Sequence, residues 1–240
     1  MSQGIFSAAS GMAADQARLD AVANDLANVN TDGYKKVRLG FRDLVYSQRD
    51  QNVWVGSGAA AVDAGRNFEQ GAVKPVDDPL ALAIDGPGFF KVTRADGSTA
   101  LTRAGSFRVD ANGRLATANG ELLDPPITLP KGVAPADLTI ATDGTVTAKG
   151  TKLGTITIVD VPAPTGLQPA GDSLFAPTAA SGAAAPVKGS TVQQHALEAS
   201  NVDASQAMTD LIDTQRSYEL ASRAITMQDQ LMQIADDLRH

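Results

Sequence analysis

Residues 5–33 decide the fold, and they read IFSAASGMAADQARLDAVANDLANVNTDG. Large apolar side chains recur every seven residues in this stretch, at Ile5, Met12, Leu19 and Leu26. A further apolar residue follows three positions later in most of the heptads, so the spacing predicts a helix of about 40 Å with a heptad stripe. We expect the helix to end near Val29, because Asn30 to Gly33 favour a stop and Gly33 suits a left-handed cap.

The C-terminal segment carries the same pattern. Apolar residues recur every seven positions, at Ala204, Leu211, Tyr218, Ile225 and Met232. No Gly or Pro occurs after Gly189, so the pattern predicts a helix that runs to about Leu238, with Ser200 or Asn201 as its cap. Both helices are too long to be covered by the middle of the chain alone. We therefore expect them to pair with each other as a coiled coil.

Turn signals crowd the middle of the chain, where all 12 prolines and 20 of the 22 glycines lie. Short β-favouring runs alternate there with hairpin dipeptides such as Asp96-Gly97, Asn112-Gly113 and Asp143-Gly144. Gly86-Pro87-Gly88 is likewise expected to join two paired strands. Residues 155–161 form the most strand-like run, and residues 162–190 predict an irregular excursion. This spacing of turns favours an antiparallel barrel or sandwich.

The sequence thus predicts an α+β fold in three parts. Residues 1–34 and 196–240 would form one helical domain from both termini. Residues 35–75 would be a linker and extended segment, and residues 76–195 a central antiparallel β-rich domain.

Composition excludes several kinds of chemistry. A net charge of −7 argues against binding to nucleic acid or to anionic membranes, and no apolar run reaches the length of a membrane span. Without cysteine, and with only His195 and His240 as histidines, the chain offers no thiolate site, two-histidine metal site or catalytic triad. The first residues also lack a signal peptide pattern. We expect no catalytic residue, no metal site and no cofactor.

A basic cluster follows the first helix, at Lys35, Lys36, Arg38 and Arg42. Two interpretations remain open. The cluster could be an ordinary solvated surface, or it could meet acids of a neighbouring subunit, such as Asp203, Asp210 and Asp213.

Three ordered segments resemble the bacterial flagellar rod and hook proteins. Residues 23–35, ANDLANVNTDGYK, are similar to the N-terminal signature of that family. Residues 84–92, IDGPGFFKV, with TRAGSF at 102–107, are similar to its central β domain. Residues 200–203, SNVD, and the helix after them are similar to its C-terminal segment. Length and β-domain motifs resemble those of distal rod subunits most, and a proximal rod subunit with a β domain is the alternative.

The resemblance implies a non-enzymatic axial subunit. Such subunits self-associate into a helical polymer, contact neighbouring rod and hook proteins, and leave the cell through the flagellar type III export apparatus. The implied location is the flagellar basal body. The expected assembly residues are Ile5, Met12, Leu19, Leu26, Asn24, Asn28, Asn30, Gly33, Tyr34, Asn201, Val202, Leu211, Tyr218 and Ile225. Two other classes of protein remain as alternative hypotheses: a secreted hydrolase that uses an Asp pair, and a coiled-coil adaptor with a β ligand-binding module.

Overall fold

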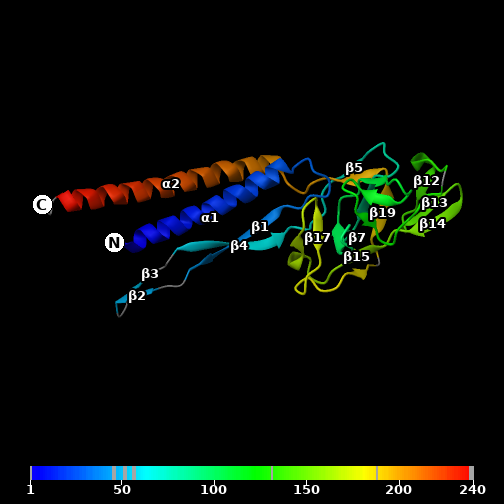
Figure 1. Ribbon diagram of the computed structural model, residues 1–240. Coiled ribbons are helices and arrows are strands. Elements are labelled where there is room, and N and C mark those ends of the chain that lie inside the picture. The colour runs from blue at the N-terminus through cyan, green and yellow to red at the C-terminus, as the bar shows by residue number, and fades with distance from the viewer. Residues whose placement is uncertain are drawn as a thin grey trace. The chain divides into compact units, whose positions relative to one another are not determined.

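The computed structural model describes residues 2–44, 47–50, 53–55, 58–130, 132–187 and 189–237. Helix α1 (Ser2–Ala27) opens the chain and α2 (Ala204–Asp237) closes it, with short strands between them (Figure 1). The fold is therefore α+β, as expected. The chain divides into two compact units. The helical unit comprises Met1–Ala27, Val37–Ala64 and Asp203–His240, and the β unit comprises Asn28–Lys36 and Gly65–Val202.

In the helical unit, α1 and α2 lie side by side and run in opposite directions (Figure 1). Four strands accompany them: β1 (Val37–Asp43), β2 (Ser47–Asp50), β3 (Val53–Val55) and β4 (Ala59–Arg66). Strand β1 pairs with β4 and contacts α1, while β2 pairs with β3. Helix α1 is thus covered from two directions, by α2 and by β1. None of the helices in the described ranges has both the length and the apolarity needed to cross a membrane.

The main sheet of the β unit is antiparallel, in the order β16-β17-β8-β7-β11-β10-β9, with β15 pairing to β7 and to β18. Its strands are β7 (Phe89–Thr93), β8 (Thr99–Thr102), β9 (Phe107–Val109), β10 (Leu115–Thr117), β11 (Leu122–Leu123), β15 (Ile158–Asp160), β16 (Gln168–Pro169), β17 (Leu174–Ala176) and β18 (Ala185–Pro186).

Three smaller sheets complete the unit. The strands β12 (Leu138–Ile140), β13 (Thr145–Ala148) and β14 (Thr151–Thr155) form one of them. The other two are the pairs β6 (Leu82–Asp85) with β19 (Thr191–Gln194) and β5 (Val73–Pro75) with β20 (Ala196–Glu198). Short 3-10 turns occur at Pro135–Asp137 and Pro164–Gly166.

The three hairpin dipeptides join the strands as predicted. Asp96-Gly97 lies between β7 and β8, Asn112-Gly113 between β9 and β10, and Asp143-Gly144 between β12 and β13, and each pair is antiparallel. The glycine of each dipeptide has a φ of +81°, which a side chain with a Cβ adopts only with strain. The turn chemistry therefore identified these hairpins correctly.

The hairpin predicted around Gly86-Pro87-Gly88 is wrong. Strand β6 pairs with β19, and β7 pairs with β8, β11 and β15. Gly86 and Gly88 have φ values of +108° and +113° and carry the chain from one sheet into another instead of folding it back. The run at 155–161 is also interrupted, since β14 ends at Thr155 and β15 begins at Ile158. The predicted irregular excursion contains the short strands β16, β17 and β18.

Strand β7 places a phenylalanine on each of its two faces, and each phenylalanine packs in a different core. Phe90 packs in the larger core with residues such as Ile84 and Val146. Phe89 packs in the smaller core with Leu101 and Phe175. Phe68, which follows β4 in sequence, has ring contacts with Phe89 and Phe175 at 5.3 and 5.1 Å between centroids. The segment around residue 68 is thereby anchored to the sheet, close to the polar cluster described next.

Candidate functional site

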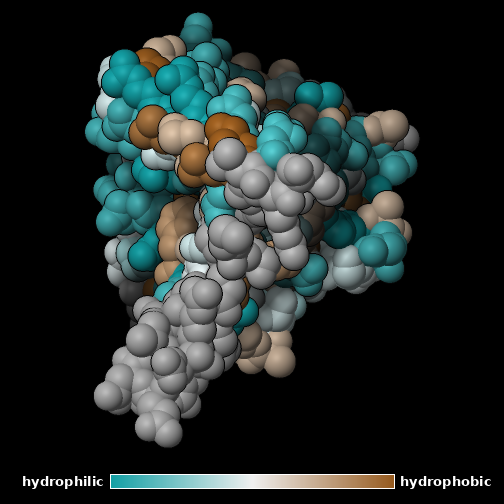
Figure 2. Space-filling model, turned by 90° about the vertical axis from the view of Figure 1, so that its left-hand side faces the viewer, coloured by the Kyte–Doolittle hydropathy of each residue, from teal (hydrophilic) through white to brown (hydrophobic). Residues whose placement is uncertain are grey.

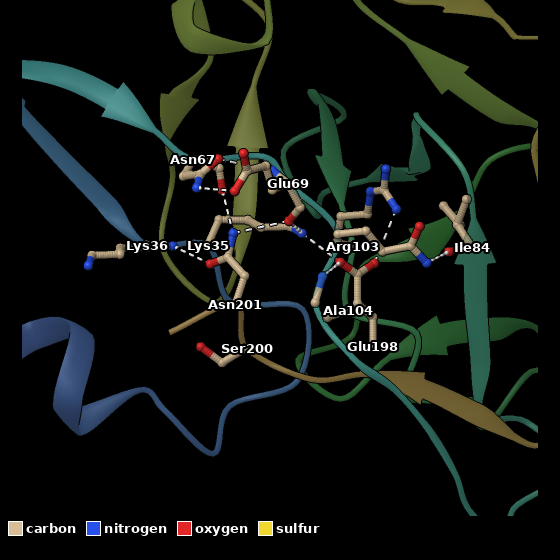
Figure 3. A network of polar contacts seen from close by, with 12 residues as sticks. Lys35, Lys36, Asn67, Glu69, Ile84, Arg103, Ala104, Glu198, Ser200 and Asn201 are labelled. Atoms are coloured by element: carbon tan, nitrogen blue, oxygen red, sulfur yellow. Dashed lines mark hydrogen bonds and ion pairs between the residues drawn. The ribbon is translucent and has the colours of Figure 1, made fainter. Parts of the chain in front are cut away.

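A buried carboxylate, that of Glu198, joins three segments of the β unit that are far apart in sequence (Figure 3). Glu198 is the last residue of β20, where it pairs with Val73 of β5. Its Oε1 accepts hydrogen bonds from Lys35 Nζ at 2.5 Å and from the Gly71 amide at 2.9 Å. Its Oε2 accepts a hydrogen bond from Arg103 Nη1 at 3.1 Å. Both oxygens are therefore occupied by donors.

The two cations of this cluster are buried as well, with the Arg103 side chain 4% exposed. The side chains of Lys35 and Glu198 are both 0% exposed. Lys35 also donates to the Glu69 carbonyl at 2.7 Å, and Arg103 Nη2 donates to the Gly86 carbonyl at 2.9 Å. Burial lowers the pKa of Lys35 and that of Arg103 from their ordinary values, and the contacts with Glu198 oppose that effect. One carboxylate thus bridges two buried cations and holds together the segments that carry them.

The Asn201 side chain adds further hydrogen bonds beside this cluster, with the backbone of Lys36, Asn67 and Glu69. Its Oδ1 accepts the Lys36 amide at 2.8 Å, and its Nδ2 donates to the carbonyls of Asn67 at 2.8 Å and Glu69 at 3.0 Å. Asn201 therefore fastens the segment that follows α1 to the segment that precedes α2 (Figure 3). Since an amide offers both donors and an acceptor, Asn is suited to bridge two backbone segments in this way.

Gly33 lies in the same part of the β unit, and no other residue fits its position. Its φ is +69°, and its amide donates to the Glu198 carbonyl at 2.7 Å. A Cβ there would lie 2.3 Å from the Ala104 backbone nitrogen. Tyr34, next in sequence, is buried, and its hydroxyl accepts a hydrogen bond from Arg66 Nη1 at 3.1 Å. Gly33 therefore does not cap α1 as expected, because the helix already ends at Ala27 and the Gly33 amide bonds to Glu198 instead; it is a packing residue in the turn that follows the helix.

The other expected assembly residues occupy three kinds of position. On the helices, Met12, Leu19, Leu26, Leu211, Tyr218 and Ile225 are half-buried. In the N-terminal signature, Asn24 and Asn30 are exposed and Asn28 is half-buried. Val202 is buried just before α2. Ile5 lies on α1, but its side chain is outside the described part of the chain. Contacts of these residues between copies stay a prediction.

The structure corrects two expectations near this cluster. Lys35 belongs neither to a solvated surface nor to a contact with another subunit, because it is buried against Glu198, whereas Arg38 and Arg42 are exposed. The cap of α2 is Asp203, not Ser200 or Asn201. Its Oδ1 accepts the amides of Ser205 at 2.8 Å and Gln206 at 3.1 Å.

Sequence reasoning could have found the cap but not the buried cluster. Asp203 followed three residues later by Gln206 has the spacing of a capping box. Glu198 and Arg103 carry no such local signal, because the partners of Glu198 lie 163 and 95 residues away. Within the described residues, no group of three or more His, Cys, Asp or Glu side chains could hold a metal ion.

Three family models match the chain in order. Residues 5–35 match "Flagella basal body rod protein", residues 83–148 match "Flagellar hook protein FlgE/F/G D1 domain", and residues 193–238 match "Flagellar basal body rod FlgEFG protein C-terminal". The chain is 39% identical to the flagellar basal-body rod protein FlgG of Caulobacter vibrioides, over 99% of both chains. It is 40% identical to FlgG of Agrobacterium fabrum over 95% of both. It is also 32% identical to the flagellar hook-basal body complex protein FlhP of Bacillus subtilis, over 93% of this chain and 94% of that protein.

Proposed function

The chain belongs to the flagellar basal-body rod protein family, and from this premise we propose that it forms the distal part of the rod as a helical tube of many copies. It is a structural subunit of the flagellar basal-body rod, and its role is in motility. The observation that carries the proposal is the similarity to FlgG proteins over almost the full length of both chains. A proximal position in the rod remains the competing assignment within the family.

In this proposal the two units have different tasks. The helices α1 and α2 pair as a coiled coil, and together with the helices of neighbouring copies they build the wall of the tube. The β unit lies outside that wall. Contact between α1 and α2, from opposite ends of the chain, supports this division, because a tube subunit needs both ends in one place. The tube transmits torque from the motor to the hook, and it acts mechanically, without catalysis or cofactor.

The proposed partners are further copies of the chain, the neighbouring rod and hook proteins, and the type III export apparatus that delivers the subunit. Nucleic acid and membrane insertion have no part in this function. The buried Glu198 cluster supports the mechanical role. It joins Lys35, in the segment that follows α1, to Glu198 at the end of β20, in the segment that precedes α2.

A deletion strain tests the position in the rod. We expect basal bodies from that strain to retain a short proximal rod and to lack the hook, and re-expression of the chain to restore both. Loss of the entire rod would instead assign the chain to the proximal position. Basal bodies of normal length and composition would contradict a role in the rod altogether, and an adaptor of discrete oligomeric state in solution would then be the better interpretation.

A further inference from the structure

Helix α2 carries a second apolar stripe that lies outside its contact with α1. The stripe consists of Leu220, Ala224, Met227, Leu231 and Ile234, spaced by four and three residues in turn. Leu220 is 66% exposed, Met227 61%, Leu231 62% and Ile234 55%. In Figure 2, hydrophobic side chains (brown) are visible among hydrophilic ones (teal) on the face turned to the viewer. Large side chains with this heptad spacing are typical of a helix that has a partner.

The partner of this stripe is not α1 of the same chain. Most of the buried or half-buried residues in the described part of α2 follow a different set of heptad positions, at Ala204, Ala207, Leu211, Thr214, Tyr218, Ala221, Ile225 and Gln228, and only Asp210 and Ser222 lie outside that set. At 3.6 residues per turn, the exposed stripe lies about a quarter-turn or more around the helix from that set. The exposed stripe thus remains uncovered after the two helices have packed.

Helix α1 exposes a stripe of the opposite character. Its exposed residues with heptad spacing are Phe6, Ala9, Ala13, Gln16, Asp20, Ala23 and Ala27. Four of the seven are alanine, so most of this surface is a shallow row into which large side chains of another helix fit. Because α2 and β1 cover its other sides, this row is the continuous surface that α1 leaves open.

The two stripes lie on opposite sides of the helical pair. On α1 the alanine row occupies the positions one and four residues after the heptad positions of Met12 and Leu19. On α2 the large stripe occupies the positions two and six residues after those of Leu211 and Tyr218. In an antiparallel pair of helices, the same heptad position on the two helices lies on the same side of the pair. The alanine row and the large stripe occupy different heptad positions, one on each side of the contact between the helices, so they point in opposite directions. One side of the pair thus carries the alanine row of α1, with Phe6 at its start and Met208 and Ile212 of α2 beside it, and the other side carries the large stripe of α2.

We propose that the large apolar stripe of α2 in one copy packs on the alanine row of α1 in a second copy. Large side chains against small ones are the arrangement that fills space between helices. The charges beside the large stripe are mixed, because Arg216 is exposed there while Asp213 continues the row of the stripe and Arg223 pairs with Glu219 at 3.9 Å. Since the two surfaces differ, the contact is heterologous. It repeats from copy to copy without closing, as a tube requires.

This inference rests on the proposed function and adds the pair of surfaces through which copies meet. It differs from the contact of Leu211, Tyr218 and Ile225, which lie on the α1-facing side of α2. Met208 and Ile212, also exposed on α2, lie on the flank shared with the alanine row and widen that surface. The assignment commits the large stripe to a second copy of this chain, not to another rod or hook protein.

The absence of cysteine from the natural sequence permits a direct test by crosslinking. Basal bodies are isolated from strains in which the only gene for this chain carries two substitutions, and they are treated with a short thiol crosslinker. One substitution is Met227→Cys, and the other is Ala9→Cys, Ala13→Cys or Ala23→Cys. We expect at least one of the three pairs to give a ladder of dimers, trimers and higher multimers. Each single-cysteine variant should give none. The matched control replaces Met227→Cys by Thr226→Cys, one residue away and exposed on another side of α2, and should also give no ladder.

Other outcomes overturn the inference. Dimers alone from Met227→Cys as a single variant would mean that two large stripes face each other. Crosslinks only to other proteins would assign the stripe to a different partner. No ladder from any pair, in basal bodies that contain the chain, would reject this contact while leaving the proposed function intact. Absence of the wild-type chain from basal bodies would reject the proposed function itself.

A charge variant gives an independent readout. Met227→Asp should leave the helicity and thermal unfolding of the soluble chain unchanged, because Met227 is exposed there. It should nevertheless abolish incorporation into basal bodies, whereas Thr226→Asp should be incorporated normally. Equal incorporation of the two variants would contradict the contact.

Discussion

Replacement of Glu198 by glutamine tests the buried cluster most sharply, because it changes one atom and almost no volume. In the native chain the carboxylate faces Lys35 at 2.5 Å and Arg103 at 3.1 Å, and the side chains of Lys35 and Glu198 are 0% exposed. An amide presents an NH₂ group toward one of these cations, so a donor then faces a donor. It also removes the negative charge that contacts both buried cations.

The magnitude follows from these contacts. Breaking a buried ion pair by removing one partner costs about 3–5 kcal/mol, because an uncompensated charge remains in the interior. Here both cations lose their counter-charge, which places Glu198→Gln at the upper end of that range. For a unit of this size the loss corresponds to a decrease in Tm on the order of 10 °C or more. Asp124→Asn is the matched control, because Asp124 pairs with Lys91 at 2.6 Å with both side chains about one-third exposed. Its cost is expected to be at most about 1 kcal/mol.

The assay is urea unfolding of the full chain, followed by circular dichroism, for the wild type, Glu198→Gln and Asp124→Asn. A second set combines Glu198→Leu with Lys35→Met and Arg103→Met. Apolar replacement of a whole buried ion cluster is often close to neutral, so this triple variant should recover most of the stability lost in Glu198→Gln. Equal losses in Glu198→Gln and Asp124→Asn would refute the reasoning, since burial would then have no bearing on the cost.

Three further predictions concern the replacement of two glycines, the contact between the helices and the stability of the chain at low pH. Gly97→Ala should lower the free energy of unfolding by about 1–2 kcal/mol, because only its left-handed backbone is strained. Gly33→Ala should lower it clearly more, because the new Cβ would also lie 2.3 Å from the Ala104 nitrogen. The Tm values of the two variants test this difference. Ile225→Asp should lower the stability of the helical unit and stop rod assembly while the protease-resistant β unit persists, and rods of normal length containing the variant would count against it. Hydrogen bonds from Ser98, Arg114 and Thr145 lower the pKa of three carboxyls below their ordinary value, those of Asp96, Asp110 and Asp143. The stability that these carboxylates contribute is therefore present above about pH 4 and lost as pH falls through the lowered folded-state pKa. Acid unfolding of the wild type and of Asp143→Asn tests this prediction, and the same pH dependence in both would contradict it.

Local chemistry was enough to predict the helices and several hairpins. The heptad spacing of Leu19 and Leu26 gave α1 to within two residues of its end, and Asp96-Gly97 gave the turn between β7 and β8. Each of these signals depends on neighbours a few residues apart. The pairing of β6 with β19 could not be predicted in this way, because those strands are separated by about a hundred residues and by the whole main sheet in sequence.

The buried cluster shows the same limit at the level of single residues. Lys35 follows a helix in a run of basic residues, and local composition therefore indicates a surface. Its burial depends on Glu198, which the β5–β20 pairing brings against it. A lysine is buried only where such a partner exists, and nothing within the ten residues around Lys35 identifies that partner.

The helix surfaces pose a different problem, because α2 contains two sets of apolar residues with the same spacing. Leu211, Tyr218 and Ile225 form one set, and Leu220, Met227 and Ile234 form the other. Sequence alone cannot decide which set contacts α1, since either would make a heptad stripe. The structure decides it through burial: the first set is half-buried and every member of the second is more than half exposed. A chain that needed only to fold would gain nothing from the second set, which lowers solubility as long as it is exposed. Its retention on the side opposite the alanine row of α1 is what a subunit requires if the same contact must be made by every copy with the next.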